Sequence, residues 1–391
     1  MIDIDQVRQD TPGCHDKIFI NSAGAALPPR QVLSSMKAYL EEEERIGGYA
    51  LAAKMADEIN GFYIEAAALL NTNPINIAFA FSATDAYGKA LSAIDFQSKD
   101  VIITSNDDYV SNQLAFLSLE KRYGVVIKRV ENTANGGLDI GHLCKLIEEK
   151  KPKLIAITHI PTSQGLIQDV HAIGQICQAE DILYLVDACQ SIGQLDVDVA
   201  SIQCDFLSAT GRKFLRGPRG TGLLYVSDKV LNSDMTPLFI DLAGAEWTSA
   251  NGFKVDQTSK RFETWEQNFA NVIGLKSAIA YARKVGQKHI ELYNGEMCRS
   301  FRNQIDSIAG VSLHDHGPEL SSIITMTKTG VDRNRFEQGL TAKNIFYSVV
   351  QRGNAVIDLD RKGIEWAIRL SPHYYNTPEE LEGVAEVIES L

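Results

Sequence analysis

The sequence predicts an α/β protein with a large domain built on a mostly parallel sheet and a smaller α+β domain. The chain has 391 residues, more than one hydrophobic core usually holds. Between about residues 85 and 226, apolar β-rich runs alternate with helical patterns, which is typical of a parallel sheet covered by helices. After about Lys284 a long helical run leads into short strands. We therefore expect residues 16–284 to form the large domain, and residues 1–15 and 285–391 the small one.

Six strands are expected in the large domain: Val101–Thr104, Val125–Val130, Leu154–Thr158, Ile182–Val186, Phe206–Ser208 and Leu223–Val226. Helical patterns separate them at Ser111–Tyr123, Ile140–Glu149 and Val170–Ala179. The small domain should contain strands within 321–327, 344–350 and 364–370, then a helix with Thr377 as N-cap and Pro378 at its first position. Ligands of parallel sheets bind beyond the carboxyl ends of the strands, so the residues that follow these strands are the first candidates for a site.

Composition excludes several classes of function. Hydrophobic residues make up 45% and charged residues 23%, as in an ordinary globular protein. A net charge of −12 argues against nucleic-acid or anionic-membrane partners. We see no signal peptide at the start and no apolar run long enough to span a membrane, so we expect a cytoplasmic protein. The six cysteines are scattered without zinc spacing, so we expect reduced thiols and no metal site.

Two strand ends carry an acid and an amine of particular interest. Asp187 ends a buried apolar strand, where a carboxylate is costly unless it meets a cation or a donor. Lys213 follows the next strand in a glycine-rich stretch. A lysine amine forms a Schiff base with an aldehyde, and a carboxylate keeps a pyridine nitrogen protonated. Taken alone, Asp187 is more readily explained as a turn cap, and Lys213 as a surface lysine.

The segments Asp187-Ala188-Cys189-Gln190 and Thr210-Gly211-Arg212-Lys213 resemble paired motifs of the class V aminotransferase family. That family includes the cysteine desulfurases and their epimerase and C–S lyase relatives. The resemblance covers nearly the whole chain. It implies the fold type I architecture of pyridoxal-phosphate-dependent transferases, an amino-acid substrate, and a homodimer with its active sites at the subunit interface.

The resemblance also implies roles for single residues. Lys213 would hold pyridoxal 5'-phosphate as a Schiff base and then move the α-proton of the substrate. Asp187 would pair with the pyridine nitrogen and Gln190 with the phenolic oxygen. Thr210 and Arg212 would contact the phosphate, a task that the guanidinium fork performs well.

Three further segments supply candidates for the cofactor. Ala83 and Thr84 begin a helical run, and a helix N-terminus binds anions, so the resemblance places the phosphate there. Tyr109 stands where desulfurases carry a histidine stacked on the pyridine ring. Thr162, after the strand that ends at Thr158, is the candidate neighbour of the ring oxygen. His159 reads more readily as a structural hydrogen-bonding residue than as a base, and we do not place it among the catalytic residues.

Two residues are candidates for the substrate carboxylate. Arg369 lies in a late Arg-x-Ser segment that resembles the family's carboxylate clamp, a bidentate task suited to guanidinium. Asn21 lies in an early segment that resembles the family's opening stretch, and would assist. A structural ion pair and a turn are the alternative roles for these two residues.

The sequence departs from the desulfurases at two places. Their mobile catalytic cysteine has no counterpart in Ser348–Asn354, and no cysteine follows Cys298. Glu266 stands where they have a threonine that reaches the partner subunit's phosphate, and a carboxylate binds phosphate poorly because like charges repel. Either Asn268 takes the place of that threonine, or Glu266 contacts the substrate or Arg212 instead. The combination resembles the epimerase-like and C–S lyase-like branch.

Several functions remain open at this point. Amino transfer, C–S cleavage by β-elimination and racemisation all begin with removal of the α-proton, and the sequence does not choose among them. A catalytically silent binding protein on the same fold is another reading. A dinucleotide oxidoreductase is disfavoured, because the glycines of Gly217–Gly222 are spaced the wrong way and precede a strand.

Overall fold

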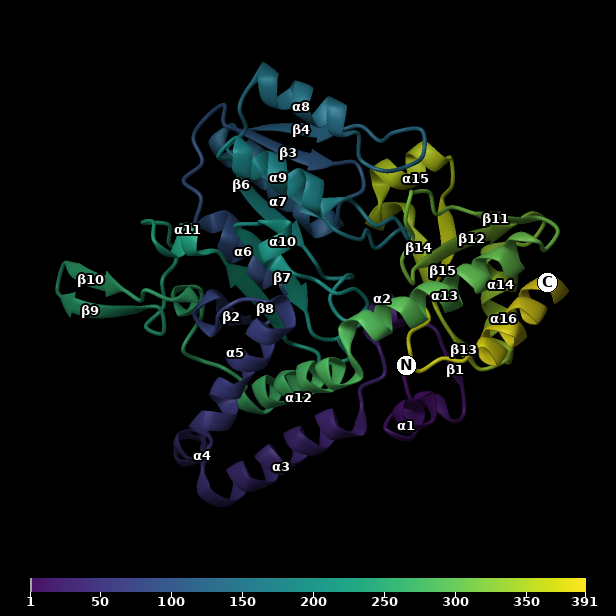
Figure 1. The fold of residues 1–391 in the computed structure, drawn as a ribbon, viewed down its shortest axis with the longest axis horizontal. Coiled ribbons are helices and arrows are strands. Elements are labelled where there is room, and N and C mark those ends of the chain that lie inside the picture. Colours follow the sequence, from purple (N-terminus) through teal and green to yellow (C-terminus); the bar gives the residue numbers. More distant parts are fainter. Residues whose placement is uncertain (1) are drawn as a thin grey trace.

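The main sheet of the computed structural model, which describes residues 2–391, has seven strands in the order β2-β8-β7-β6-β5-β3-β4 (Figure 1). Strand β8 runs antiparallel to both of its neighbours, and the other pairs from β7 to β4 are parallel. The strands are β2 Ile77–Ala80, β3 Val101–Ser105, β4 Val126–Val130, β5 Leu154–Thr158, β6 Leu183–Asp187, β7 Phe206–Thr210 and β8 Gly222–Val226. The predicted mostly parallel sheet is confirmed.

Helices cover both faces of this sheet, because its strands carry apolar side chains on both sides. Ile155 and Ile157 pack into one core, and Leu154 and Ala156 of the same strand pack into the other. Helices α5, α8, α9 and α12 contribute to the first core, and α6 and α7 to the second. The helices up to this point are α1 Ile4–Gln9, α2 Ser22–Ala25, α3 Arg30–Ile46, α4 Gly48–Lys54, α5 Ala56–Leu70, α6 Ala83–Ser92, α7 Val110–Tyr123, α8 Ile140–Glu149, α9 Val170–Ala179, α10 Val199–Ile202, α11 Asp228–Leu231 and α12 Phe269–Val285.

A second, four-stranded sheet follows in the order β11-β12-β15-β14, and all of its pairs are antiparallel. Its strands are β11 Val311–Leu313, β12 Ile324–Lys328, β14 Ser348–Gln351 and β15 Trp366–Leu370. Its helices are α13 Gln287–Asp306, α14 Arg333–Ala342, α15 Val356–Lys362 and α16 Pro378–Ser390. The long helical run predicted after Lys284 is α13, which Gly286 separates from α12 by a positive φ of 95°. Thr377 caps α16 in a capping box with Glu380.

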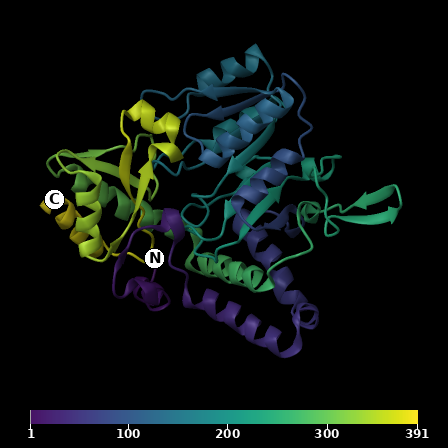
Figure 2. The same ribbon diagram turned by 180° about the vertical axis from the view of Figure 1, so that it is seen from behind.

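The N-terminal segment lies against the C-terminal elements, as Figures 1 and 2 show from opposite sides. Strand β1 (Ile18–Phe19) pairs in parallel with β13 (Ile345–Phe346), and Asn21 forms a bridge with Ser371. Strand β1 falls inside the predicted large domain, yet its partner follows residue 284. The predicted domain boundaries remain a prediction.

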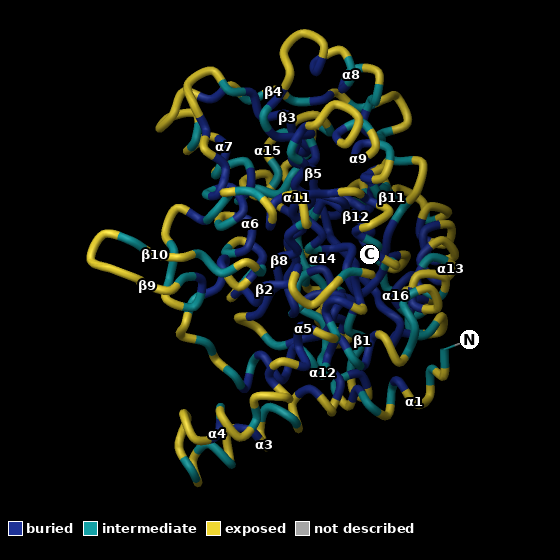
Figure 3. The backbone as a smooth tube through the Cα atoms, turned by 60° about the vertical axis from the view of Figure 1, so that its left-hand side comes forward, coloured by how far each residue is buried: buried dark blue, intermediate teal, exposed yellow. Residues whose placement is uncertain are grey.

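Two features project from the buried centre of the molecule (Figure 3). One is the helix pair α3–α4, and the other is the hairpin of β9 (Ala245–Ser249) and β10 (Gly252–Val255). Within residues 2–391, no helix is long and apolar enough to cross a membrane.

Candidate active site

The candidate site lies at the carboxyl edge of the main sheet, where the parallel strands β5, β6 and β7 end side by side. Thr158, Asp187 and Thr210 are the last residues of these three strands. The turn after β7 brings Lys213 to the same edge. The chain therefore places its acid and its amine together because consecutive parallel strands end at one edge.

Lys213 is buried, with 7% of its surface exposed. Its Nζ lies 5.8 Å from the centroid of the Tyr109 ring, so the structure places these two candidate residues next to each other. Burial lowers the pKa of the Lys213 amine, and the positive charges of Arg212 and Arg369 lower it further against the opposing effect of Asp187. A lowered pKa increases the share of neutral amine, the form that attacks an aldehyde.

The turn that carries Lys213 is fixed by hydrogen bonds from distant parts of the chain. His373 is fully buried, and its Nε2 donates to the carbonyl of Phe214, the next residue after Lys213, at 2.8 Å. The other ring nitrogen of His373 lies 3.1 Å from the Asn294 amide nitrogen. Gly193 packs so closely on this turn that a Cβ at Gly193 would lie 2.4 Å from the Phe214 carbonyl carbon. These contacts fix the position of the turn that carries Lys213.

Asp187 is 3% exposed, and hydrogen bonds satisfy both of its carboxylate oxygens. Its Oδ2 accepts from the Asn112 side-chain amide at 2.9 Å, and its Oδ1 accepts from the Cys189 backbone N–H at 2.9 Å. Asn112 lies in the first turn of α7, next to Tyr109, and also donates to Asp108. Sequence reasoning missed Asn112, although it stands in the same short segment as Tyr109. Hydrogen bonds to a carboxylate stabilise its charged form.

Arg369 on β15 lies against the loop that carries Thr162. Its Nη1 donates to the Thr162 hydroxyl at 2.7 Å and to the Thr162 carbonyl at 3.0 Å, and its Nε donates to the Ser348 hydroxyl at 2.9 Å. The Thr162 hydroxyl also accepts from the Gln190 amide at 3.0 Å. Burial and the nearby charge of Arg212 lower the pKa of Arg369 to about 10, so the guanidinium is charged at neutral pH. The structure thus brings three predicted residues together.

The predicted phosphate residues lie at the start of α6 and at the end of β7. Ser82 caps α6, and the backbone of Ser82 and Ala83 passes so close to Gly222 that a Cβ on this glycine would lie 2.7 Å from the Ser82 carbonyl carbon. Thr84 is in the first turn of α6, and α6 packs on β7, whose last residue is Thr210. Backbone N–H groups at the start of a helix suit an anion.

Arg212 and Asn21 lie on the N-terminal side of the site. The Arg212 guanidinium donates to the carbonyl of Gly24, in the segment that also contains Asn21. The Asn21 side-chain oxygen is buried without a hydrogen-bond partner in the described chain. The same holds for the Gln190 side-chain oxygen. The contact of Arg212 with the phosphate remains a prediction.

The departures from the desulfurase pattern have a clear place in the structure. Segment 348–354 forms β14 and a short 3-10 helix (Arg352–Asn354). Glu266 is exposed, and the side chain of Asn268 accepts from the Asn271 N–H as the N-cap of α12. Cys189 lies beside Asp187, and burial, followed by the negative charge of Asp187, raises the pKa of its thiol well above the ordinary value.

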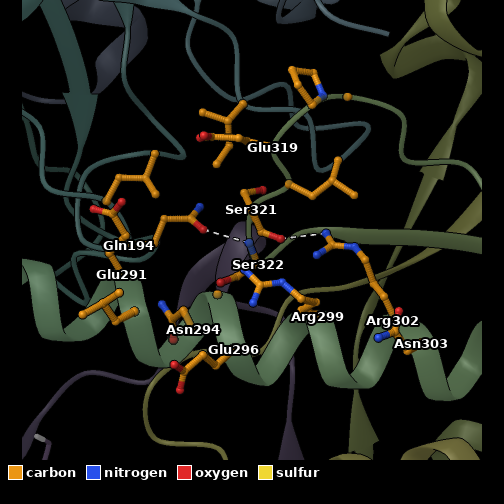
Figure 4. A pocket seen from close by; sticks show the side chains of 17 residues that line it. Gln194, Glu291, Asn294, Glu296, Arg299, Arg302, Asn303, Glu319, Ser321 and Ser322 are labelled. Carbon is orange, nitrogen blue, oxygen red and sulfur yellow. Dashed lines mark hydrogen bonds between the residues drawn. The ribbon is translucent and has the colours of Figure 1, made fainter. Parts of the chain in front are cut away.

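A polar pocket of about 570 Å³ adjoins the Gln190 loop (Figure 4). Gln194 lines it, donating to the Gln190 carbonyl and accepting from the Ser322 N–H at 3.0 Å. Arg302 on α13 donates to the Ser321 carbonyl at 2.7 Å across the same pocket. These bonds tie the Gln190 loop to the second sheet.

Residues 18–384 match the aminotransferase class-V family. The chain belongs to this family. The family consists of pyridoxal-phosphate-dependent enzymes, and this chain is one of them. The sequence-based prediction of the family, the fold and the cofactor is thereby confirmed.

Relatives and solved structures agree with the assignment over nearly the whole chain. A probable cysteine desulfurase of Methanothermobacter thermautotrophicus is 27% identical, covering 99% of this chain and 98% of that protein. The apo structure of a cysteine desulfurase from Thermococcus onnurineus superposes with a TM-score of 0.91 at 24% identity, covering 100% and 98% of the two chains. A cystine C–S lyase solved with its product cysteine persulfide superposes with a TM-score of 0.87 at 18% identity, covering 97% and 99%. At these identities the two structures show the fold.

The residues present in this class V enzyme fit the cofactor. A buried amine, a doubly hydrogen-bonded carboxylate and an aromatic ring lie at the same edge of the sheet. The Gln190 oxygen and the Asn21 oxygen, buried without partners, indicate that a bound group completes the polar contacts here. Pyridoxal phosphate supplies an electron sink for the carbanion at the substrate α-carbon when it is bound.

Proposed function

We propose that this enzyme cleaves the C–S bond of a sulfur-containing amino acid by β-elimination. In this proposal Lys213 holds the cofactor aldehyde, Asp187 holds the proton on the pyridine nitrogen, and Arg369 binds the substrate carboxylate. The substrate amino group would displace Lys213 from the aldehyde, and the freed Lys213 amine would take the α-proton. The C–S bond would then break, with its electron pair leaving on sulfur, which takes up a proton. Water would hydrolyse the released enamine, so the products are a keto acid, ammonia and a thiol or persulfide.

The observation that carries the proposal is the state of the nearest thiol. A desulfurase must attack the substrate sulfur with a thiolate. Cys189 is the cysteine beside the site, and its raised pKa keeps the thiol protonated at neutral pH. Segment 348–354, where desulfurases carry their cysteine, contains none. The solved cystine C–S lyase with its persulfide product supports the same reaction class.

The hydrogen bonds of Asp187 support its proposed place at the pyridine nitrogen. Two hydrogen bonds to its oxygens stabilise the carboxylate, and a carboxylate close to a pyridine nitrogen keeps that nitrogen protonated. Asn112 is a positioning residue in this scheme, because it would act through its hydrogen bond to the Asp187 carboxylate. Ser348 is likewise a positioning residue, because its hydroxyl accepts a hydrogen bond from the Arg369 Nε and so orients the guanidinium.

Product analysis tests the proposal directly. Purified holoenzyme is incubated with L-cystine or L-cysteine, and pyruvate, alanine and protein-bound persulfide are measured in parallel. We expect pyruvate and ammonia from at least one substrate, with no alanine and no protein persulfide. In Cys189→Ala, turnover should stay within about threefold of wild type, because the change replaces a thiol with a small side chain. Alanine together with a cysteine-bound persulfide would overturn β-elimination in favour of desulfuration.

Two other outcomes identify the remaining reactions. Amino transfer would convert the cofactor absorption to that of the pyridoxamine form, and a keto acid would restore it. Racemisation would return the D-amino acid without release of sulfur. A protein that keeps the cofactor and shows none of these reactions would be the silent binding protein.

We also infer a homodimer. Large apolar side chains are exposed on the β9–β10 hairpin and the neighbouring loops, with Trp247 80% and Phe239 88% exposed. The same region exposes Leu238, Leu242, Phe253 and Trp265. An apolar surface of this kind marks a protein interface. Sedimentation equilibrium should give twice the chain mass, and Trp247→Glu should shift it toward the monomer.

A further inference from the structure

A second cavity, of about 600 Å³, lies between the α8–α9 side of the main sheet and α13. Its lining includes five apolar side chains, namely Leu138, Ile140, Ile167, Ile173 and Leu195. It shares five lining residues with the pocket in Figure 4, among them Glu291 on α13 and Glu319 on the opposite loop. The two spaces are therefore neighbours along one groove.

Two buried polar side chains that line this cavity each have one atom without a hydrogen-bond partner in the described chain. His159 is 5% exposed and Gln168 is 2% exposed, and both line the cavity. Within residues 2–391, the His159 Nδ1 and the Gln168 Oε1 are buried and make no hydrogen bond. The Gln168 amide nitrogen is already used, because it donates to the Thr158 carbonyl at 2.9 Å and to the Ser105 hydroxyl at 3.2 Å. This fixes the Gln168 oxygen as an acceptor that still needs a donor.

The charged side chains that line the cavity are carboxylates, one of which, Asp196, lies 3.8 Å from the Lys288 ammonium group just outside the lining. Its lining contains four carboxylates and, among the described residues, no lysine or arginine; the carboxylates are Asp169, Asp196, Glu291 and Glu319. Asp169 accepts the N–H of Ala172 as the N-cap of α9, and Glu291 accepts the N–H of Asp196, so these two are held in place. Burial lowers the pKa of His159 to about 3, so its ring is neutral and does not oppose a cation.

We propose that this cavity is a second binding site, which takes a small organic cation carrying a hydroxyl or N–H group. The cationic end lies at the carboxylates, the apolar body lies on the isoleucine and leucine side chains, and the donor reaches the Gln168 oxygen. A neutral ligand of the same size would gain no attraction from the carboxylates, and an anionic ligand would be repelled by them. The cavity volume lies within the range of sites that enclose small molecules.

Choline is a suitable probe, because it has both groups and cannot form a Schiff base with the cofactor. Its control is the uncharged isostere in which a tert-butyl group replaces the trimethylammonium group. Titration calorimetry on the holoenzyme should show one saturable site for choline, weaker at high salt. The uncharged isostere should bind at least about fivefold more weakly, as expected for loss of the ionic contact.

Three variants locate the binding. Glu319→Gln removes an exposed carboxylate and should weaken choline about fivefold. Ile140→Trp fills the cavity from a half-buried position and should abolish binding. Glu296→Gln makes the same charge change at a residue that lines the Figure 4 pocket and is not part of this cavity's lining, and should leave binding unchanged. Turnover and circular dichroism check that each variant is folded.

Each contrary result overturns the inference. Failure of wild type to bind choline, equal binding of the uncharged isostere, or unchanged binding in Glu319→Gln would each do so. Should Ile140→Trp not fold, the Glu319→Gln and Glu296→Gln pair still decides the outcome. These results are independent of β-elimination, because the readout is binding and none of these residues belongs to the proposed catalytic groups.

Discussion

Replacing Arg369 with lysine tests the proposed substrate clamp while keeping its positive charge. The guanidinium is oriented by two bonds to Thr162 and one to Ser348, so its fork is fixed before substrate binds. Lysine retains a point charge and loses one of the two parallel bonds to a carboxylate. A charge-assisted hydrogen bond contributes about 1.5–3 kcal/mol, so kcat/KM for the sulfur amino acid should fall about 10- to 150-fold.

The assay is steady-state pyruvate formation, with the cofactor absorption recorded on the same samples. Absorption should match wild type, because Arg369 is not among the proposed cofactor residues. Ser348→Ala is the matched control: it removes one orienting bond and should cost about 1 kcal/mol, or about fivefold in kcat/KM. Wild-type kcat/KM in Arg369→Lys would refute the clamp, and Arg352 would be the next candidate.

Two further predictions concern the buried acid and amine. Asn112→Leu removes one bond to the Asp187 carboxylate and should lower kcat about tenfold or more, with less effect on KM, as measured by the same assay. Unchanged kcat would exclude positioning by Asn112. The pKa of Lys213 is lowered in the folded, cofactor-free protein. Between this lowered pKa and the ordinary lysine pKa, the unfolded chain therefore binds more protons than the folded one. The free energy of unfolding should rise with pH across that range. Lys213→Met should remove that part of the slope in urea titrations, and an identical pH slope in both proteins would contradict it.

The fold of the large domain could be predicted because its signal is local. Strands buried on both faces appear as short apolar runs, and β3 to β8 begin and end within two residues of the predicted ranges. Strand β2 was not predicted, since Ile77–Ala80 is a four-residue run, and its partner β8 lies more than 140 residues later in the chain. The predicted strand at 344–350 is two strands, β13 and β14, that pair with different partners.

The site could be predicted only as far as motifs and strand ends reach. Lys213, Asp187 and Tyr109 follow strands and meet at one edge, as parallel topology requires. Asn112 and Ser348 were not predicted from the sequence, because their proposed roles depend on which residues lie next to them in the folded chain. Asn112 is 75 positions from Asp187, and no spacing rule links the two.

The pairing of β1 with β13 has a consequence for synthesis of the protein. Ile18 and Phe19 leave the ribosome early, but their partners Ile345 and Phe346 emerge more than 300 residues later. The strands from β2 to β8 can assemble long before that, because their pairings are complete by residue 226. The nascent chain therefore carries β1 unpaired while the more than 300 residues up to β13 are made. The part of the site that we propose for the substrate carboxylate forms only after that, because Asn21 bridges Ser371, the residue after the strand of Arg369.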